Sequence, residues 1–255
     1  MAKRGRLVYN HHMKTKIKVP FDFPEGKRLA KKYEIIQQLG SGYEGEVYLV
    51  REVGTDIERA VKFFYPKHNA KNQALKYYAK KLHKLRHCSI LIQYHTQDSL
   101  EIDDTDVPFL VSEYVEGELL SEFLKYQPGH RLHPYQALHL LYALTKGLEE
   151  IHLQNEYHGD IHMENIIVQR YGLGFELKLI DMFRWSKHSN PENKQDDIVD
   201  AITVFYESLG GKEHYAKQDR TIKYICNGLK RSSILRKFRT ATKLREHLET
   251  LEWDE

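Results

Sequence analysis

The 255-residue sequence contains little cysteine and no long apolar run, and both absences narrow the class of protein that it encodes. Its two cysteines, Cys88 and Cys226, have neither CxxC spacing nor the density of a secreted disulfide scaffold, so we expect reduced, buried thiols. No stretch of about 18 apolar residues could span a bilayer, and the first residues lead into no apolar signal segment. The sequence therefore predicts a soluble, cytoplasmic protein without a membrane span.

Acidic residues are missing from one long part of the chain, although the net charge is only +3. No Asp or Glu occurs from Arg59 to Gln97, and residues 1–32 hold ten Lys or Arg against two acids. A basic face of this kind can attract an acidic partner or nucleic acid, but a solvated helix face and a basic tail explain the same charges. Nucleic-acid binding is therefore allowed by the sequence and not required by it.

Hydrophobic patterning divides the chain into a β-rich part and a helical part. Strands are expected over 33–39, 46–51, 59–65, 90–94, 109–114, 166–168 and 177–180. Helices are expected over 72–86, along an apolar stripe from Ala137 to Ile151, and over 197–209, with further helices to the C-terminus. The sequence thus predicts an α+β fold of two lobes, with a small antiparallel sheet and one helix at about 33–115 and a mainly helical lobe at about 116–255. Residues 1–32 are expected to form a basic N-terminal extension to this 33–255 domain.

The most informative motif is His158-Gly159-Asp160-Ile161-His162-Met163-Glu164-Asn165, which is followed by Leu179-Ile180-Asp181. Mg²⁺ prefers oxygen ligands and usually takes one or two carboxylates from the protein together with phosphate oxygens. Asn165 and Asp181 can supply such ligands, and Asp160 is then free to accept the proton of an attacking hydroxyl. The spacing predicts that the chain handles ATP with Mg²⁺.

A second motif places glycines at 40, 42 and 45. This spacing alone is a weak signal, because dinucleotide-binding folds also use it, with the glycines opening a helix. Here the chain continues as β over 46–50, which favours a hairpin whose amides close over phosphates. Lys62 on the following strand is the cation that such a loop needs.

Together and in this order, the motifs resemble the protein-kinase-like superfamily over residues 33–251. The resemblance implies a bilobal kinase fold, with Glu113-Tyr114-Val115 as the hinge that bonds adenine and Asp197 as the anchor of the catalytic loop. It implies Asp160 and Lys62 as catalytic residues and Asn165 and Asp181 as metal ligands. The implied nucleotide-binding residues are Gly40, Ser41, Gly42, Gly45, Val47, Ala60, Lys62, Glu113 and Val115.

The departures from the family pattern are also informative. The helix glutamate that normally pairs with Lys62 is replaced by Tyr78, for which packing and a hydrogen bond to Lys62 are both open roles. Without an ion pair, Lys62 would be positioned by bound phosphate alone. Asp181-Met182-Phe183 replaces Asp-Phe-Gly and removes a glycine that permits a conformational switch.

The catalytic loop also departs from the pattern. Gly159 replaces an arginine that reads a phosphorylated activation loop, so activation by loop phosphorylation is not expected. His162 could donate to phosphate or serve structure, and its His-Gly-Asp-x-His-x-x-Asn setting is similar to aminoglycoside-phosphotransferase-type enzymes. Only 16 positions separate Asp181 from Asp197, without an Ala-Pro-Glu element at its usual distance, which resembles small atypical kinases.

These features favour an atypical, compact Ser/Thr protein kinase that transfers the γ-phosphate of ATP to a hydroxyl of a protein. Two alternatives remain open. One is a small-molecule kinase of the aminoglycoside-phosphotransferase type, and the other is a pseudokinase that acts as a nucleotide-binding interaction module. Transfer of AMP would need ATP bound in the reverse sense, which nothing in the sequence requires.

Overall fold

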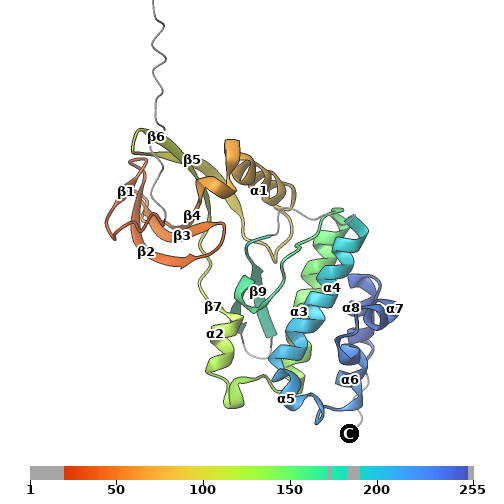
Figure 1. The fold of residues 1–255 in the computed structure, drawn as a ribbon. Coiled ribbons are helices and arrows are strands. Elements are labelled where there is room, and N and C mark those ends of the chain that lie inside the picture. The colour runs from red at the N-terminus through yellow and green to blue at the C-terminus, as the bar shows by residue number, and fades with distance from the viewer. Residues whose placement is uncertain (1–19, 172–173, 183–189, 252–255) are drawn as a thin grey trace, which may run out of the picture.

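The computed structural model describes residues 20–171, 174–182 and 190–251, and it forms two lobes joined at the hinge segment (Figure 1). A six-stranded antiparallel sheet, with strand order β1-β2-β3-β4-β6-β5, builds the N-terminal lobe. Its strands are β1 (Arg28–Leu29), β2 (Tyr33–Ser41), β3 (Gly45–Glu52), β4 (Glu58–Phe64), β5 (Tyr94–Ile102) and β6 (Thr105–Glu113). The predicted meander over the first three long strands is confirmed.

The prediction of a strand over 90–94 was wrong, because the strand β5 begins only at Tyr94. Ile90 and Leu91 lie outside the sheet of the N-terminal lobe and are nevertheless buried, and Leu91 forms an isolated parallel β-bridge with Leu179. Their burial explains the apolar signal in the sequence. The true strand is polar and mostly half-exposed at the edge of the sheet. An edge strand of this kind lacks the hydrophobic alternation on which a sequence-based prediction depends.

Alternation of side chains across the sheet separates two hydrophobic cores. Phe63 and Phe109 point into a core on one face, whereas Phe64 and Leu110 belong to the core on the other. The helix α1 (Gln73–Lys84) covers the second face through Ala74, Leu75, Tyr78, Ala79 and Leu82. The predicted helix over 72–86 is therefore confirmed, and its spacing of three and four is the reason that it buries one side.

The C-terminal lobe is mainly helical, as predicted. A long helix, α3 (Pro134–Leu153), starts with proline at its first position and a capping box between His133 and Gln136. Figure 1 shows α4 (Asn190–Ser208) lying beside α3. Gly210, which has a φ of +93°, follows the end of α4. The remaining helices are α2 (Leu120–Lys125), α5 (Gly211–Tyr215), α6 (Arg220–Cys226), α7 (Arg231–Lys237) and α8 (Ala241–Glu249).

A small antiparallel sheet lies in the C-terminal lobe beside α2 and α3 and adjoins the catalytic segments (Figure 1). It consists of β7 (Glu118–Leu119), β8 (Ile166–Tyr171) and β9 (Gly174–Leu179). The motif from His158 to Asn165 directly precedes β8, and Asp181 follows β9. Ile166, the first residue of β8, pairs with Leu179, the last residue of β9. The two catalytic segments therefore meet at the same end of this strand pair.

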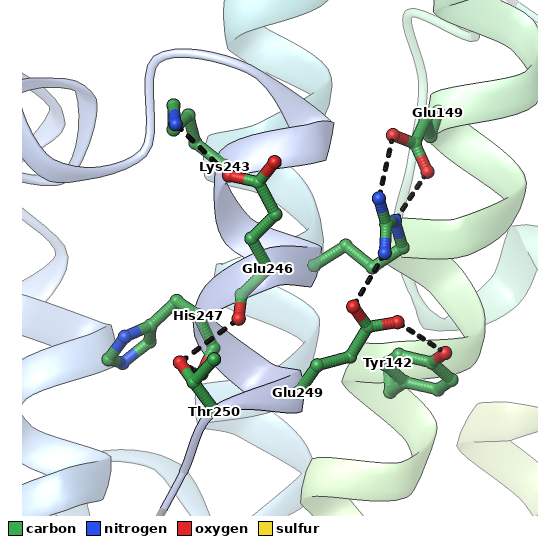
Figure 2. A network of polar contacts seen from close by, with 8 residues as sticks. Tyr142, Glu149, Lys243, Glu246, His247, Glu249 and Thr250 are labelled. Atoms are coloured by element: carbon green, nitrogen blue, oxygen red, sulfur yellow. Dashed lines mark hydrogen bonds and ion pairs between the residues drawn. The ribbon is translucent and has the colours of Figure 1, made fainter.

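A polar network fastens the last helix to α3 (Figure 2). Arg245 on α8 donates to Glu149 on α3 at 2.6 Å and to Glu249 at 2.6 Å, and the Tyr142 hydroxyl donates to Glu249 at 2.9 Å. The hydrogen bond from Arg245 lowers the pKa of Glu149, against the opposing effect of burial. The network therefore favours the ionised carboxylate and fixes the direction in which α8 packs.

Two further predictions concern cysteine and the membrane. Cys88 and Cys226 are free and buried, as expected, and burial raises the pKa of their thiols to about 11 and about 12. Among the described residues, no helix is long and apolar enough to cross a membrane. Residues 20–32, which include β1, pack on the N-terminal sheet, and the division of the chain at residue 33 stays a prediction.

Candidate active site

The glycine motif forms the hairpin between β2 and β3, as predicted, and does not open a helix. Ser41 pairs with Glu46 across the two strands, and the Gly42 amide donates to the Gly45 carbonyl at 2.9 Å. A Cβ atom on Gly45 would lie 1.9 Å from the carbonyl oxygen of Phe63, so only glycine allows this close approach. A Cβ atom on Gly40 or Gly42 would meet open space.

Lys62 lies on the face of the sheet that looks toward the C-terminal lobe. Val47 stands directly opposite it in the β3–β4 pairing, so both side chains share this face, as does Ala60 two positions earlier on β4. The Lys62 ammonium lies 2.6 Å from Asp181 Oδ1 and 3.9 Å from the Glu44 carboxylate. The hypothesis that phosphate alone would position Lys62 was wrong, because two carboxylates already hold it.

Glu44 was not singled out from the sequence, although it is the acid between Gly42 and Gly45. Its side chain is 34% exposed and reaches Lys62 from the tip of the glycine-rich hairpin. The available signal was the combination of an acid in this loop with the lack of acids from Arg59 to Gln97. Only the folded hairpin brings the two features together.

Tyr78 is buried on α1 and packs in the hydrophobic core under this helix, which confirms its predicted packing role. Its hydroxyl donates to Asp181 Oδ1 at 3.4 Å, whereas its ring centroid lies 5.1 Å from the Lys62 ammonium. Burial and the charge of Asp181 raise the pKa of Tyr78 well above its ordinary value, so the phenol remains a donor. The predicted hydrogen bond to Lys62 is thus replaced by one to Asp181 and a cation–π contact.

Asp197 on α4 fastens the catalytic loop. Its buried carboxylate accepts from the backbone amides of His158 at 2.8 Å and Gly159 at 2.7 Å, and it lies 2.9 Å from His152 Nε2. Gly159 has a φ of +86°, a conformation that favours glycine. The loop backbone is therefore fastened to α4, whereas the Asp160 side chain stays 45% exposed.

Asp160 and Asn165 are brought together within the loop. The Asn165 Nδ2 donates to the backbone carbonyl of Asp160 at 2.9 Å and to its carboxylate at 3.0 Å. Since the amide nitrogen faces these acceptors, the Asn165 side-chain oxygen is directed away from Asp160. The Asp160 side chain remains 45% exposed and can meet a substrate.

A backbone hydrogen bond places Asp181 beside Asp160 and Asn165. The Ile180 amide donates to the Asn165 carbonyl at 3.0 Å, so Asp181 lies beside the catalytic loop. Asp181 has a φ of +55°, which is unusual for a residue other than glycine and is typical of functional sites under conformational constraint. Burial acts to raise the pKa of Asp181, but the adjacent Lys62 cation outweighs it and lowers the pKa.

The donor atoms present fit a magnesium ion. Asn165 offers an amide oxygen and Asp181 an ionised carboxylate, and both are hard oxygen ligands. The described residues contain no group of three or more His, Cys, Asp and Glu arranged to hold a metal by themselves. A metal at Asn165 and Asp181 would therefore take its other ligands from phosphate and water.

His162 stands between two acids of the catalytic loop. Its Nε2 lies 3.6 Å from Asp160 Oδ1, and its Nδ1 lies 2.9 Å from the Glu164 carboxylate. Nε2 also lies 2.9 Å from the Asn165 amide nitrogen. These contacts agree with support of the loop, and donation to phosphate stays a prediction.

The hinge prediction concerns Glu113 to Val115, which link β6 to the C-terminal lobe. A shallow hollow of about 370 Å³ is lined by these residues and by Lys178. The Lys178 ammonium donates to the Glu113 carboxylate at 2.8 Å and so fixes the outer side of the hinge. The predictions for Phe183 and the segment 184–189 fall outside the described residues.

The family model for the protein kinase domain matches residues 33–225. The chain belongs to the protein kinase family. The bilobal kinase fold predicted from the sequence is confirmed.

Relatives of this kinase domain include Ser/Thr kinases. The serine/threonine-protein kinase PrkC of Bacillus subtilis (strain 168) is 29% identical over 150 residues, which are 58% of this chain and 22% of that protein. An Aurora kinase of Patiria pectinifera is 32% identical over 196 residues, which are 73% of this chain and 44% of that protein. The chain therefore spans less than half the length of either relative.

A solved structure shows the same fold. The crystal structure of the Mycobacterium tuberculosis PknI kinase domain superimposes with a TM-score of 0.61 and 16% sequence identity. The superposition covers 89% of this chain and 98% of that chain. At this level of identity the likeness supports the shared fold alone.

One acid near the catalytic loop leads to a pH-dependent prediction. Burial, followed by the charges of Asp197, Asp196 and Asp160, raises the pKa of Asp200 from 3.8 to about 7. Between these two values the native protein retains a proton that the unfolded chain has lost, so stability falls as pH rises. We expect Asp200→Asn to raise the free energy of unfolding by about 2 kcal/mol near pH 8, after allowance for partial exposure.

Urea denaturation at several pH values checks this expectation. The gain should shrink as pH falls below about 7 and be nearly absent near pH 3, where Asp200 is protonated in the native protein and largely so in the unfolded chain. Asp106→Asn, at an exposed position of β6, is the matched control and should show no such pH dependence. A gain for Asp200→Asn that is constant over pH would contradict the assigned cause.

Proposed function

We propose that the chain is an atypical, compact Ser/Thr protein kinase that transfers the γ-phosphate of ATP, bound with Mg²⁺, to a hydroxyl of a protein. One observation carries the proposal. The Lys62–Asp181 pair, at 2.6 Å, and the Asp160–Asn165 pair, at 3.0 Å, are joined by the hydrogen bond from the Ile180 amide to the Asn165 carbonyl into one group. A cation for phosphate, two metal ligands and a base are thereby assembled.

The chemistry follows from the charges of these groups. Both members of the Lys62–Asp181 pair can bind a group of opposite charge in Mg·ATP. Lys62 can pair with phosphate, and the Asp181 carboxylate can bind the metal. The glycine-rich hairpin presents backbone amides to phosphate, and the hinge at Glu113 and Val115 presents backbone groups to adenine. When bound by Asn165 and Asp181, Mg²⁺ would neutralise charge on the phosphates.

Asp160 has the role of orienting the acceptor hydroxyl and taking its proton. Its carboxylate is held by the Asn165 amide on one side, which fixes its direction without covering it. Asp197 holds the loop backbone, so Asp160 does not need to be ordered anew for each acceptor. Orientation of this kind lowers the entropic part of the barrier.

Relatives that are named serine/threonine-protein kinases, such as PrkC, support a protein acceptor. Two observations favour the other two functions, a small-molecule kinase and a pseudokinase. The position of His162 beside Asp160 is similar to the loop of aminoglycoside-phosphotransferase-type enzymes and favours a small-molecule acceptor. Tyr78 in place of the helix glutamate favours a nucleotide-binding pseudokinase.

The test is incubation of the purified chain with γ-labelled ATP and Mg²⁺, with and without cell lysate. We expect label on Ser or Thr of the chain itself or of lysate proteins, and loss of that label in Asp181→Asn, with Asp106→Asn as the matched control. Label on small molecules alone would identify the second class, and ATP binding without label would identify the pseudokinase. Label that survives in Asp181→Asn would remove Asp181 from the site.

A further inference from the structure

Glu46 is a fully buried acid on β3, directly after the last glycine of the glycine-rich hairpin. Within the described part of the chain, its carboxylate accepts hydrogen bonds from neutral donors. These are the Phe21 amide at 2.7 Å, the Asp22 amide at 3.3 Å, the Tyr48 hydroxyl and the Gln38 amide at 3.5 Å. A buried carboxylate needs such partners, so its presence here depends on the segment before β1.

The two backbone donors form a preformed anion site. Phe21 and Asp22 are consecutive, and Asp22 has a φ of +48°, which turns neighbouring amides toward one concave side. Phe23 follows with its own amide donating to the Tyr48 hydroxyl at 3.2 Å. The segment 21–23, which we name the N-terminal clasp, is therefore tied to β3 through its backbone.

Aromatic contacts tie the clasp to β4 as well. The Phe21 ring lies 5.4 Å from Phe63 and 5.8 Å from Tyr65, and the Phe23 ring lies 5.0 Å from Phe63. Phe23 is buried, whereas Phe21 remains half-buried. Contacts of this type contribute about 0.5–1.5 kcal/mol for each pair beyond burial.

All of these contacts fall near the turn of the glycine-rich hairpin. The Tyr65 amide donates to the Glu44 carbonyl at 2.8 Å, and Phe63 carries the carbonyl that Gly45 approaches. Phe63 is also the neighbour of Lys62 in sequence. The clasp therefore holds both the strand that enters the nucleotide site and the turn that covers it.

The clasp lies before residue 33, where the match to the protein kinase family begins. We propose that Phe21 and Glu46 are positioning residues for the nucleotide, since the clasp holds the glycine-rich hairpin at a defined height over Lys62. The proposal rests on the proposed binding of ATP. Loss of the clasp loosens the hairpin and weakens ATP binding while the catalytic loop in the other lobe keeps its arrangement.

The experiment uses the full chain with Phe21→Ala, which leaves Glu46 paired and removes only a half-buried ring. The conservative variant is Phe21→Leu, and the matched control is Tyr224→Ala, which removes a ring from the C-terminal lobe that is 48% exposed and 6.3 Å from Phe238. Amide hydrogen exchange is followed in peptides that contain Gly42 to Glu46 and Tyr65. The KM for ATP and kcat are measured in parallel.

In Phe21→Ala we expect faster exchange in these peptides and a KM for ATP raised about 3–10-fold, the factor that corresponds to one aromatic pair. The value of kcat should change little, and Phe21→Leu should recover part of the protection. Exchange that stays at the wild-type rate, or rises equally in Tyr224→Ala, would overturn the proposal. Failure of the proposed function gives a different result, because the wild-type protein would then transfer no phosphate. The exchange rates would still show whether the clasp holds the hairpin.

Discussion

Replacement of Asp160 by alanine is expected to lower the rate of phosphate transfer by about 10²–10⁴-fold and to leave ATP affinity nearly unchanged. The carboxylate is 45% exposed and is held by the Asn165 amide at 3.0 Å. Its removal takes away the proton acceptor, but Lys62, Asp181 and the glycine-rich hairpin remain in place. The effect should therefore fall on the chemical step.

Initial rates with γ-labelled ATP and the dissociation constant of the nucleotide, measured on the same preparation, separate the two effects. Asp106→Ala removes an exposed carboxylate from the N-terminal lobe and should match wild type in both measurements. Transfer retained by Asp160→Ala would exclude Asp160 from the mechanism. An equal loss of affinity would mean that the loop, and with it the site, had moved.

Replacement of Asp197 by asparagine is expected to lower the free energy of unfolding by about 2–4 kcal/mol and to reduce transfer as well. The carboxylate is fully buried and satisfies the His158 and Gly159 amides together with His152. An asparagine offers one acceptor oxygen in place of two, so a buried donor loses its partner. The catalytic loop then loses its attachment to α4.

Urea denaturation measures the change in stability. The matched control is Asp196→Asn on the same helix, because Asp196 pairs with Arg231 at 2.7 Å on the surface, where an ion pair contributes about 1 kcal/mol or less. If both variants lost the same small amount, Asp197 would not be the anchor that the geometry indicates. If Asp197→Asn kept full transfer despite the lost stability, the loop would be held by other contacts.

Local patterns predicted most of the fold because they reflect short-range physics. Apolar residues at spacings of three and four predicted α1 and α3, and β-rich runs around the glycines predicted the first three long strands. The edge strand β5 escaped prediction because it buries little and shows no alternation. The buried pair Ile90 and Leu91 was mistaken for a strand, since burial outside a sheet and burial in a sheet leave the same apolar signal.

The candidate site divides in the same way. The spacing of Asp160, Asn165 and Asp181 predicted that they would converge with Lys62, and the Lys62–Asp181 pair shows this convergence for two of them. The partner of the Tyr78 hydroxyl could not be predicted, because it depends on how α1 packs against the segment after β9. The Glu44–Lys62 contact depends in turn on the height of the hairpin over β4.

The sequence by itself determined the family, the order of the lobes and the residue types of the site, because each of these depends on motifs within a few positions of one another. Tertiary structure alone decided which carboxylates face Lys62, how Asp197 holds the catalytic loop, and that the clasp reaches Glu46 across 25 positions. Contacts between distant segments depend on strand register and helix packing. Strand register and helix packing are determined by the whole core and cannot be predicted from any single segment of the sequence.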